Sequence, residues 1–206
     1  MRALLGRPPA QAARALIGCV LVCRRDGRTL RARIVETEAY LGEGDPAAHA
    51  SAGRTARTQP LWGEPGTLYV YFIYGVHHCL NLAVDRAGRP GCVLVRAAEP
   101  LAGSGLEPFA CRGPGRLCRA LGIDRRLSGR HLFEDDATLT LREGPPPRRI
   151  GVGPRVGLSK AAERPLRFYD ADSAAVSAMR PAGVSSARGR RSRPAAAPTT
   201  QKRGRR

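Results

Sequence analysis

The chain has 206 residues, 42% of them hydrophobic, and it carries a net charge of +18. This length fits one globular domain with a tail, and the longest apolar run, residues 15–23, is too short to cross a bilayer, which argues against a membrane-spanning protein. Arginine supplies 33 of the 35 basic residues. Because guanidinium groups pair bidentately with phosphates, this excess predicts a polyanionic partner, with nucleic acid ahead of an anionic membrane.

The six cysteines form no C-x-x-C pair, and no histidine stands at zinc-finger spacing from them. Several lie in apolar runs, as buried free thiols usually do. We therefore expect a protein of the reducing cytoplasm with no disulfide and no structural metal. The cysteines are Cys19, Cys23, Cys79, Cys92, Cys111 and Cys118.

The first part of the chain predicts a helix followed by a strand hairpin. Residues 9–17 have a proline near the first turn of a short helix. Residues 18–25 form a buried strand, and the Asp26–Gly27 turn joins it to a long strand over 29–41. Residues 42–66 contain five glycines and three prolines, and a loop of this length inside a compact domain is usually functional.

The second part predicts more strands and one helix. Residues 66–84 form two strands that turn near Tyr74, and residues 91–101 form another strand. The fold class we predict is α+β: a single domain with a curved, mostly antiparallel sheet, flanking short helices and a protruding aromatic hairpin. The remaining elements are a helix over 113–123, a strand over 137–144, and a glycine-rich strand with a closing segment over 149–169.

The domain is predicted to span residues 1–171, and residues 172–206 form an Ala-, Arg- and Pro-rich tail. Residues 179–206 hold nine basic residues and no acidic one. Such a segment cannot bury enough apolar surface to fold, so we expect a disordered arm that binds phosphates without sequence preference. The plainer alternative is a solvated tail without a function.

The long strand carries two carboxylates on one predicted face. Because side chains alternate along a strand, Val35, Thr37 and Ala39 face one side, while Glu36, Glu38 and Tyr40 face the other. Carboxylates on an apolar-flanked strand are costly to bury unless they are paired. The functional interpretation is a general base in a pocket, and the alternative is the solvent face of an edge strand.

The stretch GTLYVYFIYG concentrates four of the ten aromatic residues, Tyr69, Tyr71, Phe72 and Tyr74. Tyrosine hydroxyls need hydrogen-bond partners, so a simple core would use leucine or phenylalanine instead. Tyrosine rings suit a surface on which bases stack, and a ring at a turn suits a wedge between base pairs. An ordinary half-buried pair of strands is the alternative.

Several long motifs then appear in one order: RIVETEAYLGEGDPAAHASAGRT, EPGTLYVYFIYGVHHCLNLAV, CVLVRAAEPL, GPGRLCRALGI and RPLRFY. This order resembles the alkyladenine (3-methyladenine) DNA glycosylase family over about residues 8–170. The resemblance implies a monofunctional base-excision-repair enzyme, likewise without a metal or cofactor. Such an enzyme flips a damaged purine out of double-stranded DNA before it acts on it. We expect a monomer that binds DNA and no membrane.

The resemblance also implies roles for single residues of the pocket. The flipped base stacks between Tyr40 and Tyr71, and His49 lies on its edge. Tyr74 fills the gap that the base leaves in the duplex. Asn81 clashes with the amino group of guanine and so rejects a normal base.

The same resemblance makes Glu38 the catalytic carboxylate, which activates the attacking water, and Arg96 the group that orients this water. The single lysine of the predicted domain, Lys160, lies near its end, which favours water over an amine as the nucleophile. Trp62 and Glu64 depart from the family pattern, as does the sequence after RPLRFY. Two alternatives stay open: a damage-binding protein without catalysis, and a different hydrolase or transferase on a similar sheet.

Overall fold

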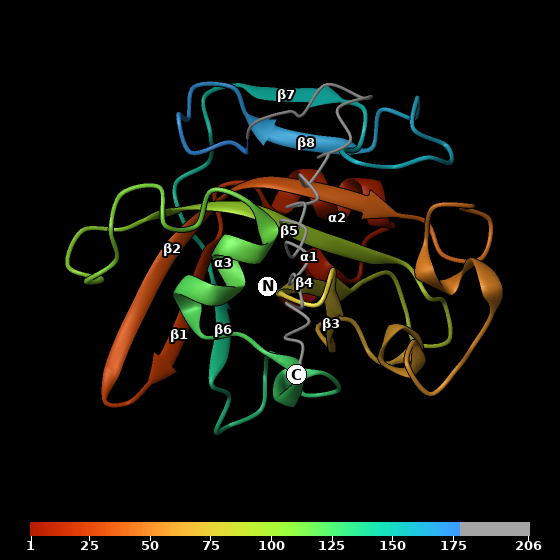
Figure 1. Ribbon diagram of the computed structural model, residues 1–206, viewed down its shortest axis with the longest axis horizontal. Coiled ribbons are helices and arrows are strands. Elements are labelled where there is room, and N and C mark those ends of the chain that lie inside the picture. Colours follow the sequence, from red (N-terminus) through yellow and green to blue (C-terminus); the bar gives the residue numbers. More distant parts are fainter. Residues whose placement is uncertain (178–206) are drawn as a thin grey trace, which may run out of the picture.

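The computed structural model describes residues 1–177 (Figure 1). It is an α+β fold in which one curled antiparallel sheet carries three short α-helices and three 3-10 turns. The elements are α1 (Arg2–Leu5), α2 (Pro9–Leu16), β1 (Val20–Arg25), β2 (Arg28–Tyr40), η1 (His49–Ala52), η2 (Gln59–Trp62), β3 (Leu68–Ile73), β4 (His77–Ala83), β5 (Cys92–Pro100), α3 (Pro114–Leu121), η3 (Arg125–Leu127), β6 (Leu139–Arg142), β7 (Ile150–Gly153) and β8 (Arg167–Asp170).

The sheet has eight strands, and β2 lies in its middle. The main strand order is β3-β4-β5-β2-β1-β6, and β8 joins β2 to β7. β5 pairs along one edge of β2, whereas the other edge is shared: residues 28–33 pair with β1 and residues 36–38 pair with β8. The two glutamates of β2 therefore lie between two strands, which rules out the edge-strand interpretation of this segment.

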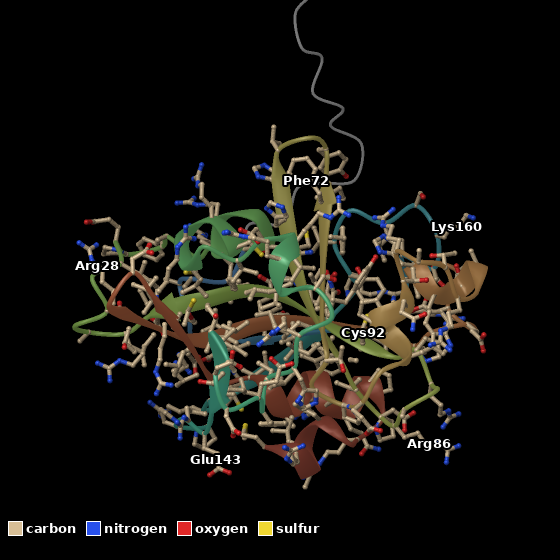
Figure 2. The ribbon with its side chains drawn as sticks, turned by 90° about the horizontal axis from the view of Figure 1, so that it is seen from below. Arg28, Phe72, Arg86, Cys92, Glu143 and Lys160 are labelled. Carbon is tan, nitrogen blue, oxygen red and sulfur yellow. The ribbon has the colours of Figure 1, made fainter. Side chains whose placement is uncertain are left out.

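The helices close the core from the side away from the hairpin. Figure 2 shows α1 and α2 at the opposite end of the molecule from the β3–β4 hairpin. α2 buries Ala12, Ala13 and Leu16, and the Thr37 hydroxyl of β2 donates a hydrogen bond of 2.9 Å to the Ala13 carbonyl. This contact fixes the inward face of β2, so that its other face is free to carry polar groups.

A β-bulge changes the predicted alternation of β2. The pairing with β5 shifts on either side of Glu36, and Val35 has no partner in the register. Val35 packs with Ala97 and Ala175 in a separate cluster, while Thr37 reaches Ala13 of α2. The prediction that Val35 shares a face with Thr37 and Ala39 is therefore wrong, because the extra residue resets the period of two.

The other elements follow the sequence prediction. The predicted helices and strands are all present, and the turn after β1 has positive φ at Asp26 and Gly27, as a type I′ hairpin turn requires. All six cysteines are free and buried thiols. Within residues 1–177, no helix is long and apolar enough to span a membrane.

The first residues of the predicted tail contact the sheet. Ala175 is 2% exposed, and the Ser177 N–H donates a hydrogen bond of 2.7 Å to the Glu36 carboxylate. Residues 178–206 lie outside the described part of the chain, so the disordered arm stays a prediction. The last described residues thus reach the middle of the sheet, where they satisfy a buried carboxylate.

Two truncations separate this contact from the rest of the tail. A chain that ends after Asp172 should lose about 2–4 kcal/mol of unfolding free energy, because it exposes Ala175's partners and leaves a Glu36 oxygen without its donor. A chain that ends after residue 180 should keep the full-length value within about 0.5 kcal/mol. Urea unfolding measures both, and equal stability of the two chains would contradict the role of residues 175–177.

Candidate active site

Glu38 is a buried carboxylate of β2 with no exposed surface. Its Oε1 accepts a hydrogen bond of 2.7 Å from the Val156 N–H and lies 3.2 Å from Nη1 of Arg96. Its Oε2 accepts a hydrogen bond of 3.0 Å from the Tyr40 hydroxyl. Burial raises the pKa of Glu38 above the ordinary carboxyl value, although Arg96, the Val156 N–H and Tyr40 each act to lower it.

Glu36, the second carboxylate of β2, holds the surrounding cations. Its Oε1 accepts hydrogen bonds from Nε of Arg96 at 3.1 Å and from Nε of Arg167 at 2.6 Å. Its Oε2 accepts the Ser177 N–H. Arg96 therefore bridges both glutamates, and Glu36 orients the guanidinium that faces Glu38. Regular alternation from Glu36 to Glu38, as predicted from the sequence, places both carboxylates on the side of Arg96.

The predicted base-pocket tyrosines lie in one cluster. Tyr40 and Tyr71 both pack against a buried cluster that contains Tyr69, and the rings of Tyr69 and Tyr71 are 5.5 Å apart. His49 meets Tyr71 at a centroid distance of 4.5 Å, and its Nδ1 lies 2.9 Å from the Tyr69 hydroxyl. Tyr69 is thus a buried support for His49, a role that the sequence did not indicate.

The electrostatics of this cluster keep the histidine uncharged. Burial lowers the pKa of His49, and the nearby Arg57 guanidinium lowers it further. The same guanidinium lies 5.6 Å from the centroid of the Tyr71 ring. Because Nδ1 of the neutral His49 already contacts the Tyr69 hydroxyl, only Nε2 is left to hydrogen-bond to a ligand.

Asn81 lies on β4 opposite Tyr69 and is 3% exposed. Its side-chain amide donates a hydrogen bond of 3.2 Å to the Tyr69 carbonyl. The weak contact from the Cys92 thiol to its Oδ1, at 3.9 Å, is the second hydrogen bond of this side chain. Asn81 is therefore fixed on the same sheet face as the tyrosines, with no freedom to swing away from a bulky ligand.

The hairpin tip presents a bare aromatic ring. Tyr74 is 83% exposed, and both Tyr74 and Gly75 have positive φ, while the Val76 N–H donates to the Ile73 carbonyl at 3.3 Å. A non-glycine residue in this region costs about 1–2 kcal/mol. Figure 2 shows the hairpin, with Phe72 labelled, projecting from the body of the protein.

Trp62 and Glu64, the two residues before β3 that depart from the family pattern, have different surroundings. Trp62 packs against the cluster of Leu61, Tyr69 and Cys92, so its bulk fills space beneath the tyrosines. Glu64 is exposed, and its carbonyl accepts a hydrogen bond of 2.8 Å from the Thr67 hydroxyl. Trp62 is therefore a packing residue of the pocket wall.

Comparison with known proteins identifies the family to which this chain belongs. Residues 3–174 match the model of "Methylpurine-DNA glycosylase (MPG)". The chain belongs to the methylpurine-DNA glycosylase family. Three relatives carry the name "Putative 3-methyladenine DNA glycosylase": one from Methanocella arvoryzae is 43% identical over 86% of this chain and 95% of its own length. Those from Myxococcus xanthus and Synechococcus elongatus are 45% and 46% identical, over 86% and 84% of this chain and 92% and 88% of their own lengths.

For a member of the methylpurine-DNA glycosylase family, the substrate is DNA and the reaction is hydrolysis of an N-glycosyl bond. The structure brings most of the predicted residues together on neighbouring strands, with His49 of η1 packed against Tyr71, whereas Tyr74 stays apart at the hairpin tip. Glu38 and Arg96 form one end of the site, whereas Tyr71, His49 and Asn81 form the other. Tyr40 joins the two ends, because it packs with the tyrosines and donates to Glu38.

The positive φ of Tyr74 at the hairpin tip leads to a prediction about the stability of the protein. Tyr74→Asn should raise the unfolding free energy by about 1 kcal/mol, since asparagine tolerates positive φ and Asn-Gly is a preferred type I′ turn. Urea unfolding measures the change. The control is Val76→Asn, which alters the same exposed tip without relieving a positive φ, and a gain of equal size in both variants would contradict the assignment of strain to Tyr74.

Proposed function

We propose that this chain is a monofunctional DNA glycosylase of base-excision repair. It would flip an alkylated or deaminated purine out of duplex DNA and hydrolyse its N-glycosidic bond, leaving an abasic site. The observation that carries this proposal is the buried Glu38 carboxylate, held by Arg96 and Tyr40 beside a tyrosine pocket. A protein that only binds DNA has no need for an ionisable group in that position.

Flipping is supported by the hairpin. Extrusion of a nucleotide costs a few kcal/mol of stacking and pairing, and a side chain that fills the gap offsets this cost. The exposed Tyr74 ring at the projecting tip suits this role. Its strained backbone fits as well, because strain is retained where a ring must be held in a fixed direction.

Recognition of the flipped base is assigned to the pocket tyrosines and their neighbours. Tyr40 and Tyr71 would stack on the base, since aromatic rings give sequence-tolerant stacking energy. Neutral His49 would hydrogen-bond to the base edge, with its tautomer set by the Tyr69 hydroxyl. Asn81, held by the Tyr69 carbonyl, would clash with the amino group of guanine.

The proposed chemistry follows from the carboxylate. Cleavage of the N-glycosidic bond builds positive charge on the sugar, which a carboxylate stabilises while it also takes a proton from water. An ionised carboxylate has about four acceptor positions, and three donors already contact Glu38. The remaining position can hold the attacking water, and Arg96 lies where it can orient this water. An alkylated purine leaves readily, because it is already cationic.

Water, and not an amine, is the proposed nucleophile. A glycosylase that also cuts the strand forms a Schiff base through an amine. Lys160, the one lysine among residues 1–177, is exposed in the loop between β7 and β8, and Figure 2 shows it at the periphery. This position supports a glycosylase without lyase activity. We further propose that the enzyme acts as a cytoplasmic monomer.

A second candidate is a damage-binding protein that uses the same pocket without catalysis. Glu38 has no exposed surface, which favours this candidate, because catalysis requires a water molecule beside the carboxylate. The two candidates agree on binding and differ only in turnover.

A single-turnover base-release assay distinguishes them. Duplexes with hypoxanthine, ethenoadenine or a methylated purine are incubated with excess protein, and alkali then cleaves the abasic sites. Wild type should release at least one of these bases, and Glu38→Gln should reduce the rate about 1,000-fold or more while lesion binding survives. Glu99→Gln, which alters a carboxylate of a different ion pair, should leave the rate unchanged. Binding without release by wild type would favour the second candidate.

The pKa of Glu38 sets the pH dependence. Only the ionised carboxylate can accept a proton from water, and burial raises its pKa above the usual carboxyl value. The release rate for a cationic methylated purine, which needs no acid, should therefore fall as the pH drops through this raised pKa. A rate profile between pH 4 and 8 measures it, and a rate that stays constant down to the ordinary carboxyl range would argue against Glu38 as the base.

A further inference from the structure

A second buried ion pair lies behind the predicted catalytic residues, between Asp45 and Arg155. We propose that Arg155, anchored by Asp45, is a positioning residue of the site: it holds the Val156 N–H on Glu38 and supports the Tyr40 ring from behind. The inference rests on the proposed function, because it concerns the efficiency of the glycosylase reaction. Neither residue was singled out by the sequence, where they are 110 positions apart.

The pair is bidentate and closed to water. Both side chains have no exposed surface, and Nη2 of Arg155 donates to Oδ1 of Asp45 at 2.9 Å while Nη1 donates to Oδ2. Nη1 also donates to the Ala39 carbonyl of β2 at 3.0 Å. The guanidinium is thus fixed to the end of the strand that carries Glu38 and Tyr40.

Asp45 connects this pair to the loop after β2. Its carboxylate accepts hydrogen bonds of 3.2 Å from the N–H groups of Leu41 and Ala47. The loop between Tyr40 and His49 therefore folds around Asp45. The position of two predicted pocket residues depends on the same carboxylate that holds Arg155.

Arg155 in turn acts on Glu38 by two routes. Its guanidinium carbon lies 4.7 Å from the centroid of the Tyr40 ring, whose hydroxyl donates to Oε2 of Glu38. The next residue, Val156, donates its N–H to Oε1. Each oxygen of the catalytic carboxylate therefore receives a hydrogen bond whose donor is placed by Arg155.

The surroundings of Arg155 support a role in positioning the groups that donate to Glu38. It is the buried residue of an otherwise largely exposed loop, in which Pro154, Gly157 and Lys160 face the solvent (Figure 2 labels Lys160). A buried ion pair adds little net stability compared with packed apolar side chains, because desolvation offsets the attraction. It does fix direction, since a planar guanidinium and a carboxylate meet in one geometry. That property is what a loop needs when it must deliver one N–H group to a carboxylate.

The test compares Arg155→Lys with Arg33→Lys in the single-turnover base-release assay. Lysine keeps the charge but cannot form the bidentate pair, and Arg33 is a matched control whose ion pair with Asp170 contacts no pocket residue. Arg155→Lys should slow release about 10–100-fold, because small displacements of reacting groups cost rates of this order, while affinity for the lesion duplex changes less than about threefold. The control should release bases at the wild-type rate.

A pH profile separates positioning from general damage to the fold. The charged or titratable groups facing Glu38 are Glu36, Tyr40, Cys79, Arg96 and Arg155, and the Val156 N–H favours its ionised form. Loss of the N–H bond should move the acidic limb of the release rate to higher pH in Arg155→Lys. An unmoved limb with an unchanged rate in the folded protein would overturn the proposal.

Asp45→Asn provides a second variant that keeps an oxygen for the Leu41 and Ala47 N–H groups. It should show the same rate loss, and the double variant should be no slower than the slower single one, because both changes break one contact. Additive losses would overturn the proposal. Absence of release by wild type is a different result, since it contradicts the proposed glycosylase function and not the placement of Arg155.

Discussion

The burial of two carboxylates in the middle of the sheet is the constraint on which the other features depend. A buried carboxylate without donors would cost several kcal/mol, so the fold must bring donors to Glu36 and Glu38 from many directions. They come from β5, from β8, from the β7–β8 loop and from the chain near Ser177. The bulge in β2 lies just before these carboxylates, at Val35, which packs with Ala97 and Ala175 while Glu36 and Glu38 both face Arg96.

The same constraint explains why stability and the proposed function conflict in this molecule. Glu38 is held in a place that disfavours its charged form, yet the charged form is the one that can act as a base. At the hairpin tip, a tyrosine occupies a backbone conformation better suited to asparagine or glycine. Both features are costly for folding alone, and both lie where the proposed reaction needs them.

The sequence predicts the elements of this fold well because strand alternation, the hairpin turns and the proline at the start of α2 are local signals. It also places Glu36 and Glu38 on one face of β2, since a period of two suffices where a strand is regular. It fails at Val35, where a single extra residue shifts the period. The Asp45–Arg155 pair was not predictable either, because a contact between distant loops leaves no pattern in either segment.

The distribution of charge separates the interior of the site from the surface that meets DNA. Inside, the carboxylates of Glu36, Glu38 and Asp45 are matched by the guanidinium groups of Arg96, Arg167 and Arg155. These groups cancel, so the net charge of +18 resides in the rest of the chain. Long-range attraction of a phosphate backbone therefore does not depend on the cations of the site, where the three arginines organise the three carboxylates. A basic protein can in this way keep an acidic group ionisable at its centre.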